Sequence, residues 1–126
     1  MEQKTVLIVE DQLEALTINK IYLERSGYHV LAAENGLEGI RCAREHRPHL
    51  ILMDLSMPKL DGVGATLQLK QDPVTRDIPV VLLTAHGYGS VGRRAREAGC
   101  AGFLAKPCDP HRVLVEVQEL IGSPVH

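Results

Sequence analysis

Aromatic side chains are scarce in this sequence of 126 residues, which contains no Trp and a single Phe. Stacking on single-stranded nucleic acid requires several exposed aromatic rings, so this mode of binding is not expected. The formal net charge of −2 provides no basic field that would draw the chain to DNA or to an acidic membrane. We therefore expect neither nucleic acid nor membrane among its direct partners.

The sequence also lacks an apolar run of transmembrane length. Residues 2–4 lead almost at once into a strand pattern, so we expect no signal peptide. The three cysteines, Cys42, Cys100 and Cys108, form an odd and scattered set, which indicates a reducing compartment and not a disulfide framework. These features together predict a soluble cytoplasmic protein.

What the sequence does contain is enough apolar material for one core. Hydrophobic residues make up 44% of the chain, and Ile, Leu and Val supply most of them. A chain of this length forms one ordinary domain. We see no internal repeat or linker, so we expect one domain over residues 1–122 and a short tail over residues 123–126.

Short apolar runs alternate with helical patterns along the whole chain. Five runs have the length and composition of strands: 5–9, 28–33, 50–53, 78–83 and 102–105. The run 28–33 includes His29, as expected of a strand nearer a sheet edge. The run 78–83 is continuously apolar, which is typical of a strand covered on both faces. Five strands separated by helices predict an α/β domain with a parallel sheet and right-handed crossovers.

The first two helices have recognisable ends. A helix over about 12–25 ends at Ser26-Gly27, where Gly suits a left-handed cap. Asn35 and Glu38 form a capping-box pattern that begins a second helix, which ends near His46 before a proline.

The remaining helices differ in clarity. A third begins near Gly62, has Val63 and Leu67 as its expected inward positions, and stops at 72–73. The glycine-rich segment 86–92 predicts a fourth helix that begins late. The last helix opens with a capping Asp and a Pro and has the clearest apolar stripe, at Val113, Leu114, Val117, Leu120 and Ile121.

Polar side chains follow four of the predicted strands. Glu10 and Asp11 follow the first, Asp54 the third, Thr84 the fourth and Lys106 the fifth. Ligands of open α/β sheets bind beyond the carboxyl ends of the strands, so we expect these groups to gather at one edge.

Three carboxylates in one place require compensation. Two carboxylates about 4 Å apart repel by roughly 4 kcal/mol at an effective dielectric constant of 20. Either protons bind and raise some pKa values, or a divalent cation lies among them. Mg²⁺ (or Mn²⁺) suits oxygen ligands and a phosphate partner, and no His/Cys set offers zinc a better site.

Four features of the sequence resemble those of a response-regulator receiver domain. They are the acidic pair after the first strand, the Asp-x-x-x-Pro-x-x-Asp-Gly segment from Asp54, the Thr84 position and Lys106-Pro107. The spacings from Asp11 through Asp54 and Thr84 to Lys106 are 43, 30 and 22 residues, which fit that family. The resemblance covers nearly the whole chain. It implies a flavodoxin-like, doubly wound fold with five helices and strand order 2-1-3-4-5.

The resemblance implies that Asp54 accepts a phosphoryl group from a phosphohistidine on a histidine kinase or a histidine phosphotransfer protein. It also implies that Mg²⁺ is held by Glu10 or Asp11, by Asp54 and by the main-chain carbonyl of Ser56. A carboxylate is a competent phosphoryl nucleophile, and such transfer depends mainly on positioning and charge stabilisation.

Further roles follow from the same resemblance. Lys106 and Thr84 would contact phosphoryl oxygens, and Phe103 would rotate into space that Thr84 vacates. The surface from the fourth helix to the fifth would then change its affinity for a downstream protein target. Ser56 and His86 would tune hydrolysis, and Pro107 is expected to follow a cis peptide bond. A homodimer that forms on phosphorylation is left open.

Each residue also has a simpler interpretation. Glu10 and Asp11 suit a helix cap, and we expect Asp11 to cap the first helix as well as serve the metal. Thr84 could merely end a strand, and Phe103 could merely fill the core. The four-part set of strand-end groups favours the signalling function.

Other functions remain as alternatives. A Mg²⁺-dependent phosphohydrolase with an Asp nucleophile would commonly have Asp-x-Asp after its first strand, whereas Asp54 follows the third. A flavin- or nucleotide-binding domain would need a glycine-rich loop at residues 11–13, which is absent. A receiver used only for docking would not need the acceptor residues. The chain could also be a receiver fragment of a larger regulator or hybrid histidine kinase.

Overall fold

The computed structural model describes residues 2–57, 60–85 and 89–125. Strands and helices alternate throughout these residues. In chain order the elements are β1 (Thr5–Val9), α1 (Leu13–Arg25), β2 (His29–Ala33), α2 (Gly36–His46), β3 (Leu50–Asp54), α3 (Gly62–Gln71), β4 (Val80–Thr84), α4 (Ser90–Glu97), β5 (Gly102–Ala105) and α5 (Pro110–Ile121).

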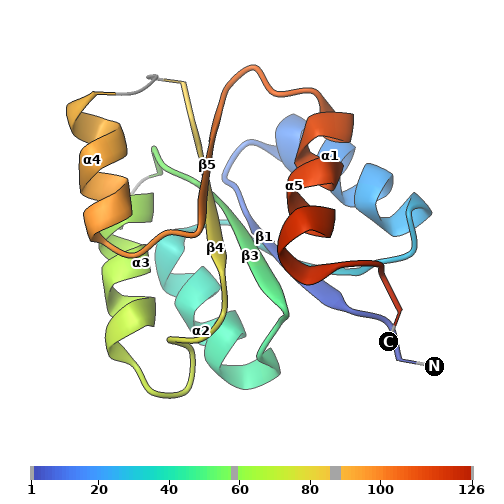
Figure 1. Ribbon diagram of the computed structural model, residues 1–126, viewed down its shortest axis with the longest axis horizontal. Helices are drawn as coiled ribbons and strands as arrows, with labels where there is room; N and C mark the ends of the chain where they lie inside the picture. Colours follow the sequence, from blue (N-terminus) through green and yellow to red (C-terminus); the bar gives the residue numbers. More distant parts are fainter. Residues whose placement is uncertain (1, 58–59, 86–88, 126) are drawn as a thin grey trace.

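The strands form one parallel sheet in the order β2-β1-β3-β4-β5 (Figure 1). This confirms the predicted strand order. The chain reverses direction across the sheet after β2, since β1 lies between β2 and β3. The switch point therefore falls between β1 and β3, whose carboxyl ends carry the acidic residues.

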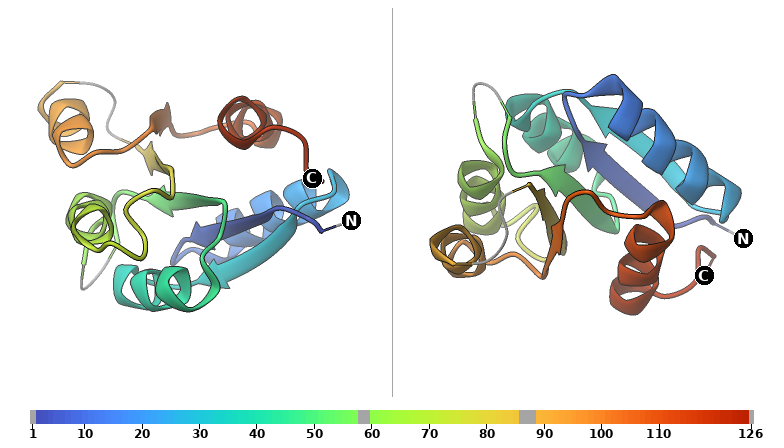
Figure 2. Two further views of the ribbon diagram at one scale, coloured as in Figure 1. Left: turned by 60° about the horizontal axis from the view of Figure 1, so that its bottom comes forward. Right: turned by 90° about the horizontal axis from the view of Figure 1, so that it is seen from above.

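The helices cover both faces of the sheet, as the two views in Figure 2 show. Because strand side chains alternate between faces, Val6 and Ile8 pack with α1 and α5, whereas Leu7 and Val9 pack with α2, α3 and α4. All four of these side chains are at most 1% exposed. Burial on both faces explains why the central strands are continuously apolar.

Two strands begin later than predicted, for identifiable reasons. Tyr28 is buried, but its N–H donates to the carbonyl of Leu23 at 3.1 Å and closes the turn after α1, so β2 begins at His29. The N–H of Ile78 donates to Thr75, and Pro79 has no N–H, so β4 begins at Val80. At their other ends β3 and β4 extend by one residue, to Asp54 and Thr84.

The predicted helix starts are confirmed at four places, one of which is the start of α3 at Gly62. Asn35 accepts a hydrogen bond from the N–H of Glu38 at 3.0 Å. Asp109 caps α5 by accepting from the N–H of His111 at 2.8 Å. Helix α4 begins late, at Ser90.

The inward face of α3 was predicted only in part. Val63 is buried, but Leu67 is 43% exposed, so its assignment as an inward position was wrong. The buried positions of α3 are Gly62, Val63, Ala65, Thr66 and Leu69. Leu67 lies instead beside a groove that α3 forms with α4, together with Val63 and Arg94.

The last residues pack against the first ones. The N–H of Lys4 donates to the carbonyl of Pro124 at 2.7 Å, and Gln3 forms an isolated bridge with Val125. Figure 1 shows both termini at the same end of the molecule. Among the helices of the described residues, none combines the length and apolarity needed to cross a bilayer.

Candidate functional site

Asp54 is the last residue of β3, and its side chain is almost fully enclosed, with 6% of the residue exposed. The strand continues to pair one residue further, because the N–H of Leu55 donates to Leu83 at 2.8 Å. The chain then turns away, so the carboxylate lies at the end of the sheet where the carboxyl ends of the strands meet.

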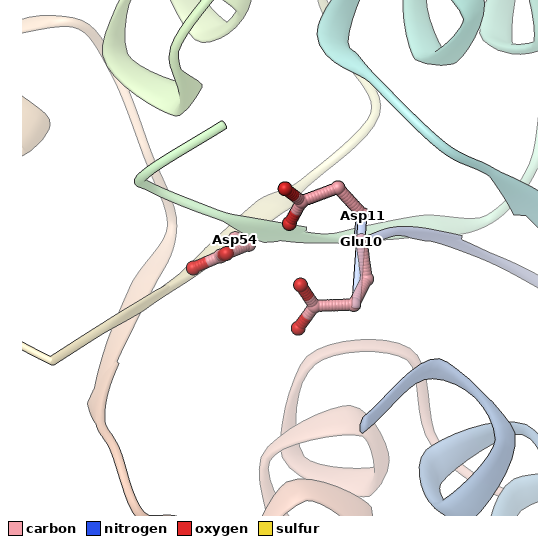
Figure 3. Close-up of side chains that lie close together, drawn as sticks. All are labelled: Glu10, Asp11 and Asp54. Atoms are coloured by element: carbon pink, nitrogen blue, oxygen red, sulfur yellow. The ribbon is translucent and has the colours of Figure 1, made fainter. Parts of the chain in front are cut away.

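Glu10 and Asp11 follow β1, the neighbour of β3 in the sheet. Glu10 is only 3% exposed, and its N–H donates to Ala33 of β2 at 3.0 Å. One carboxylate oxygen from each of Glu10, Asp11 and Asp54 lies within 4.8 Å of the others (Figure 3). The gathering of three carboxylates predicted from the strand ends is therefore present.

The expectation that Asp11 caps α1 was wrong. The N-cap residue is Gln12, and no side chain caps the helix there. The carboxylate of Glu10 instead accepts from the N–H of Gln12 at 3.3 Å. The exposed Asp11 side chain contributes its carboxylate to the acidic cluster.

Lys106 brings the positive charge into the same place. Its ammonium Nζ lies 3.0 Å from Oε1 of Glu10 and 3.3 Å from Oδ1 of Asp54. The backbone holds the residue at the end of β5, since the Lys106 N–H donates to Thr84 at 2.6 Å. The Lys106–Pro107 peptide bond is cis, as expected.

The electrostatics of this cluster are set mainly by burial. Burial raises the pKa of Glu10, and the charge of Asp54 raises it further, against the hydrogen bond from Lys106. Burial alone would lower the pKa of Lys106. The hydrogen bond to Glu10 and the two carboxylate charges outweigh this and raise that pKa. Lys106 therefore stays an ammonium.

The donor set fits a small divalent cation. Three carboxylates face one ammonium, and Glu10 is buried in a place that penalises its negative charge. A dication would remove that penalty, and oxygen donors are the ligands that Mg²⁺ and Mn²⁺ take. The site therefore offers a chemically suitable place for the predicted metal.

Thr84 and Phe103 lie between the acidic cluster and the face of the sheet that α4 covers. Thr84 is 1% exposed and ends β4, one residue beyond Leu83, which pairs with Asp54. In the register of β4 and β5, Leu82 pairs with Phe103 and Thr84 with Ala105. Residues two apart on a strand share a face, so Thr84 and the half-buried Phe103 lie on the same side of the sheet.

Ser56 and His86 are the two residues expected to tune hydrolysis. Ser56 is exposed two residues after Asp54. His86 lies outside the residues that the structure describes.

One glycine of the predicted segment has a structural role at the site. Gly62 was predicted as a helix start and as the last residue of the Asp-x-x-x-Pro-x-x-Asp-Gly segment, and its N–H donates to Leu55 at 2.8 Å. A Cβ at Gly62 would lie 2.8 Å from the carbonyl oxygen of Asp54 and 2.8 Å from Cα of Leu55. The motif already singled out this glycine, and the close approach of its backbone to Asp54 and Leu55 gives the physical reason for it.

We expect Gly62→Ala to destabilise the protein by about 1–3 kcal/mol, because the added methyl would press on the backbone that carries Asp54. Gly92→Ala is the matched control, since a Cβ there would meet only an Arg96 side-chain atom at 3.7 Å. The control should be neutral or slightly stabilising. Urea unfolding of both variants tests this. Equal stability of the two would contradict the close approach at Gly62.

Comparison with known proteins places this geometry in a family. The sequence matches the response regulator receiver domain over residues 6–118. It is 38% identical to the polar-differentiation response regulator DivK of Brucella anthropi over 120 residues, which cover 95% of this chain and 98% of that protein. The DivK of Brucella ovis is 36% identical over the same shares.

Solved structures agree. The receiver domain of a sensor histidine kinase from Pseudomonas aeruginosa, described with a magnesium ion coordinated in its active-site cleft, has a TM-score of 0.88 and 31% identity. The comparison covers 97% of this chain and 100% of that one. The chemotaxis protein CheY4 of Vibrio cholerae has a TM-score of 0.90 at 24% identity over 94% of this chain and 99% of that one, which shows a shared fold.

The chain therefore belongs to the response-regulator receiver family. It is a receiver domain of two-component signalling, a class of phosphate-accepting signalling proteins. Receiver domains bind Mg²⁺ at an acidic pocket, and Glu10, Asp11 and Asp54 form such a pocket here.

Proposed function

We propose that Asp54 is the phosphate acceptor of this receiver, and that the acceptor reaction depends on Mg²⁺. The observation that carries this is the contact of Lys106 with both Glu10 and Asp54 inside a cluster of three carboxylates. A structural ion pair would need one carboxylate. The extra negative charges make sense where a dication and a phosphoryl group are handled together.

In the proposed reaction an oxygen of Asp54 attacks the phosphorus of a donor phosphohistidine. The new P–O bond forms as the P–N bond breaks, and the electron pair of that bond remains on the imidazole. Glu10, Asp11, Asp54 and the carbonyl of Ser56 would hold Mg²⁺, which supplies positive charge beside the phosphoryl oxygens. Ser56, exposed at the rim, would tune the later attack of water.

Lys106 would then change partners. Its ammonium contacts Glu10 and Asp54 before transfer and would pair with a phosphoryl oxygen afterwards. The Thr84 hydroxyl would turn toward another phosphoryl oxygen, and Phe103 would follow into the space. Shifting such an equilibrium from 1:99 to 99:1 requires about 5.5 kcal/mol, which a dianionic group with these contacts can supply.

The phosphate donor would dock on α1. Leu13 and Ile18 of α1 are 74% and 55% exposed and line one hollow together, so they form an exposed apolar patch. Ile18 also lines a hollow of about 250 Å³ that reaches Lys106 and Cys108. An apolar helix face of a histidine kinase or a histidine phosphotransfer protein fits this surface beside the acceptor.

The relatives include both DivK regulators and the receiver domain of a sensor kinase. A stand-alone regulator and a receiver domain of a larger kinase are therefore both compatible with this chain. We propose a cytoplasmic location for either form. The free thiols of Cys42, Cys100 and Cys108 fit a reducing compartment.

Removal of the metal tests the proposal. With acetyl phosphate and Mg²⁺ the protein should gain an alkali-labile phosphate, detected as added mass on the intact chain. With EDTA the gain should fall by at least tenfold, because the carboxylate cluster would lack its counter-charge. Re-addition of Mg²⁺ or Mn²⁺ should restore it. Equal labelling with and without metal would contradict the proposed role of the cluster.

A further inference from the structure

Helix α4 carries a concentration of positive charge that the phosphate site does not use. Its eight residues include Arg93, Arg94 and Arg96, against a single acidic residue, Glu97. The whole chain has a formal net charge of −2. The net +2 of α4 therefore stands on a molecule whose remainder is net −4.

The arginines occupy the outer side of this helix. Ala95 and Ala98 are 0% and 4% exposed and pack toward the sheet, whereas all three arginine side chains are exposed. Within the described part of the chain, none of the three guanidinium groups forms an ion pair. Their charge is therefore available to a partner. Figure 1 shows α4 at the margin of the molecule, with α3 on one side and β5 on the other.

Two hollows adjoin the charged face, and the one beside Phe103 is mainly apolar. Arg96 lines one of about 260 Å³ together with Cys100 and Phe103. A second hollow along the helix, of about 380 Å³, is lined by Gly89, Arg93, Arg96 and Glu97. Arg96 belongs to both, so an anionic group held there would lie next to Phe103.

We propose that the outer face of α4 binds an acidic protein segment of the downstream partner. Its carboxylates would pair with Arg93 and Arg96, and an apolar side chain would enter the hollow beside Phe103. Planar guanidinium groups bind carboxylates in a bidentate manner, which provides register as well as attraction. The inference rests on the proposed function, since it supplies the chemistry of the partner that the switched surface recognises.

A random peptide library displayed on phage tests this even while the partner is unidentified. Selection on the protein treated with acetyl phosphate and Mg²⁺ should enrich sequences that combine several Asp or Glu residues with an apolar residue. Enrichment of neutral or basic sequences, or no enrichment of acidic ones, would overturn the proposal. Phosphate uptake is measured on the same samples. A failure of Asp54 labelling would therefore be seen separately from a failure of acidic selection.

Variants then test the residues with one selected peptide, by fluorescence anisotropy. Arg93→Gln/Arg96→Gln should weaken binding about tenfold, and higher salt should weaken it in the wild type. Glu97→Gln should strengthen binding about two- to threefold, since it removes a repulsive charge. The control Arg41→Gln/Arg76→Gln removes two exposed arginines outside α4 and should bind like the wild type.

Two outcomes would refute this assignment. An equal loss of peptide affinity in the α4 and control variants would show that the effect comes from the overall charge of the protein. Random duplex DNA that binds with the same dependence on Arg93 and Arg96, and displaces the peptide, would identify the face as a nucleic-acid surface. Thermal unfolding and phosphate uptake of each variant show that its fold and acceptor site are intact.

Discussion

Asp54→Asn should abolish the gain of alkali-labile phosphate from acetyl phosphate, while the wild-type protein is labelled under the same conditions. The amide lacks the anionic oxygen that attacks phosphorus. The shape of the side chain is retained, so the buried position at the end of β3 is not disturbed. Lys106 keeps its 3.0 Å contact with Glu10.

A matched control is available nearby. Asp61 is the N-cap of α3 and accepts from the N–H of Gly64 at 2.8 Å. Asn caps helices about as well as Asp, so Asp61→Asn should be labelled like the wild type. Equal labelling of Asp54→Asn and the wild type would remove Asp54 as the acceptor.

The same variant should not be less stable than the wild type in the absence of metal. The charge of Asp54 contributes to the raised pKa of Glu10, which means that the two carboxylates repel. Replacing one of them with an amide relieves that repulsion, which offsets the lost ion pair of Asp54 with Lys106, and Lys106 keeps Glu10 as its partner.

The sheet and its acidic edge were predictable because they follow from rules that act along the chain. A strand buried on both faces must be apolar without interruption, as Val80–Thr84 is, up to the residue at its end. Parallel strands place their carboxyl ends at one edge. Glu10 and Asp54 therefore meet although they lie on separate strands, far apart in the sequence. This step does not depend on how the side chains pack.

What the sequence did not reveal depends on which elements become neighbours. Leu67 has the spacing of an inward position, but the place of α4 beside α3 leaves it at the edge of a groove. Glu10 and Asp11 are adjacent carboxylates. Only the backbone direction after β1 decides that Glu10 reaches the N–H of Gln12 while Asp11 does not cap α1.

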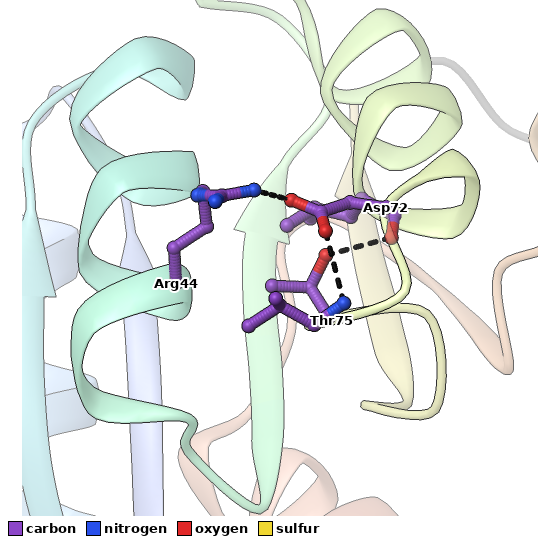
Figure 4. Close-up of polar contacts among 5 residues, drawn as sticks. Arg44, Asp72 and Thr75 are labelled. Carbon is purple, nitrogen blue, oxygen red and sulfur yellow. Dashed lines mark hydrogen bonds and ion pairs between the residues drawn. The ribbon is translucent and has the colours of Figure 1, made fainter.

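The ion pair that joins α2 to the end of α3 also depends on which helices become neighbours. Arg44 of α2 forms an ion pair with Asp72, just after α3, and 28 residues separate them (Figure 4). Asp72 also accepts from the N–H of Val74 at 2.9 Å, and the buried hydroxyl of Thr75 donates to Leu69 at 2.7 Å. The sequence predicted Asp72-Pro73 as a helix stop, but the pairing of Asp72 with Arg44 is set by the packing of α2 against α3.

Lys106→Met should separate phosphate uptake from the response of the output face. Met retains the apolar stem, while the charge that contacts Glu10 and Asp54 is lost. Labelling of Asp54 with Mg²⁺ should persist, and Mg²⁺ should bind at least as tightly, because no ammonium competes for the carboxylates. The phosphate-induced changes in amide NMR signals at Phe103 and Arg96 should be absent. Retention of those changes would exclude Lys106 from the switch.

Stability gives a second readout of the same variant. Without metal, the variant should lose on the order of 2 kcal/mol. This is less than for a fully buried pair, because the Lys106 side chain is 23% exposed whereas that of Glu10 is 3% exposed. Added Mg²⁺ should raise the melting temperature of Lys106→Met more than that of the wild type, since the dication replaces the lost charge. Lys20→Met, which breaks only an exposed pair with Glu24, should behave like the wild type in both measurements. If Mg²⁺ stabilised all three proteins equally, the carboxylates that Lys106 contacts would not be the ones that bind the metal.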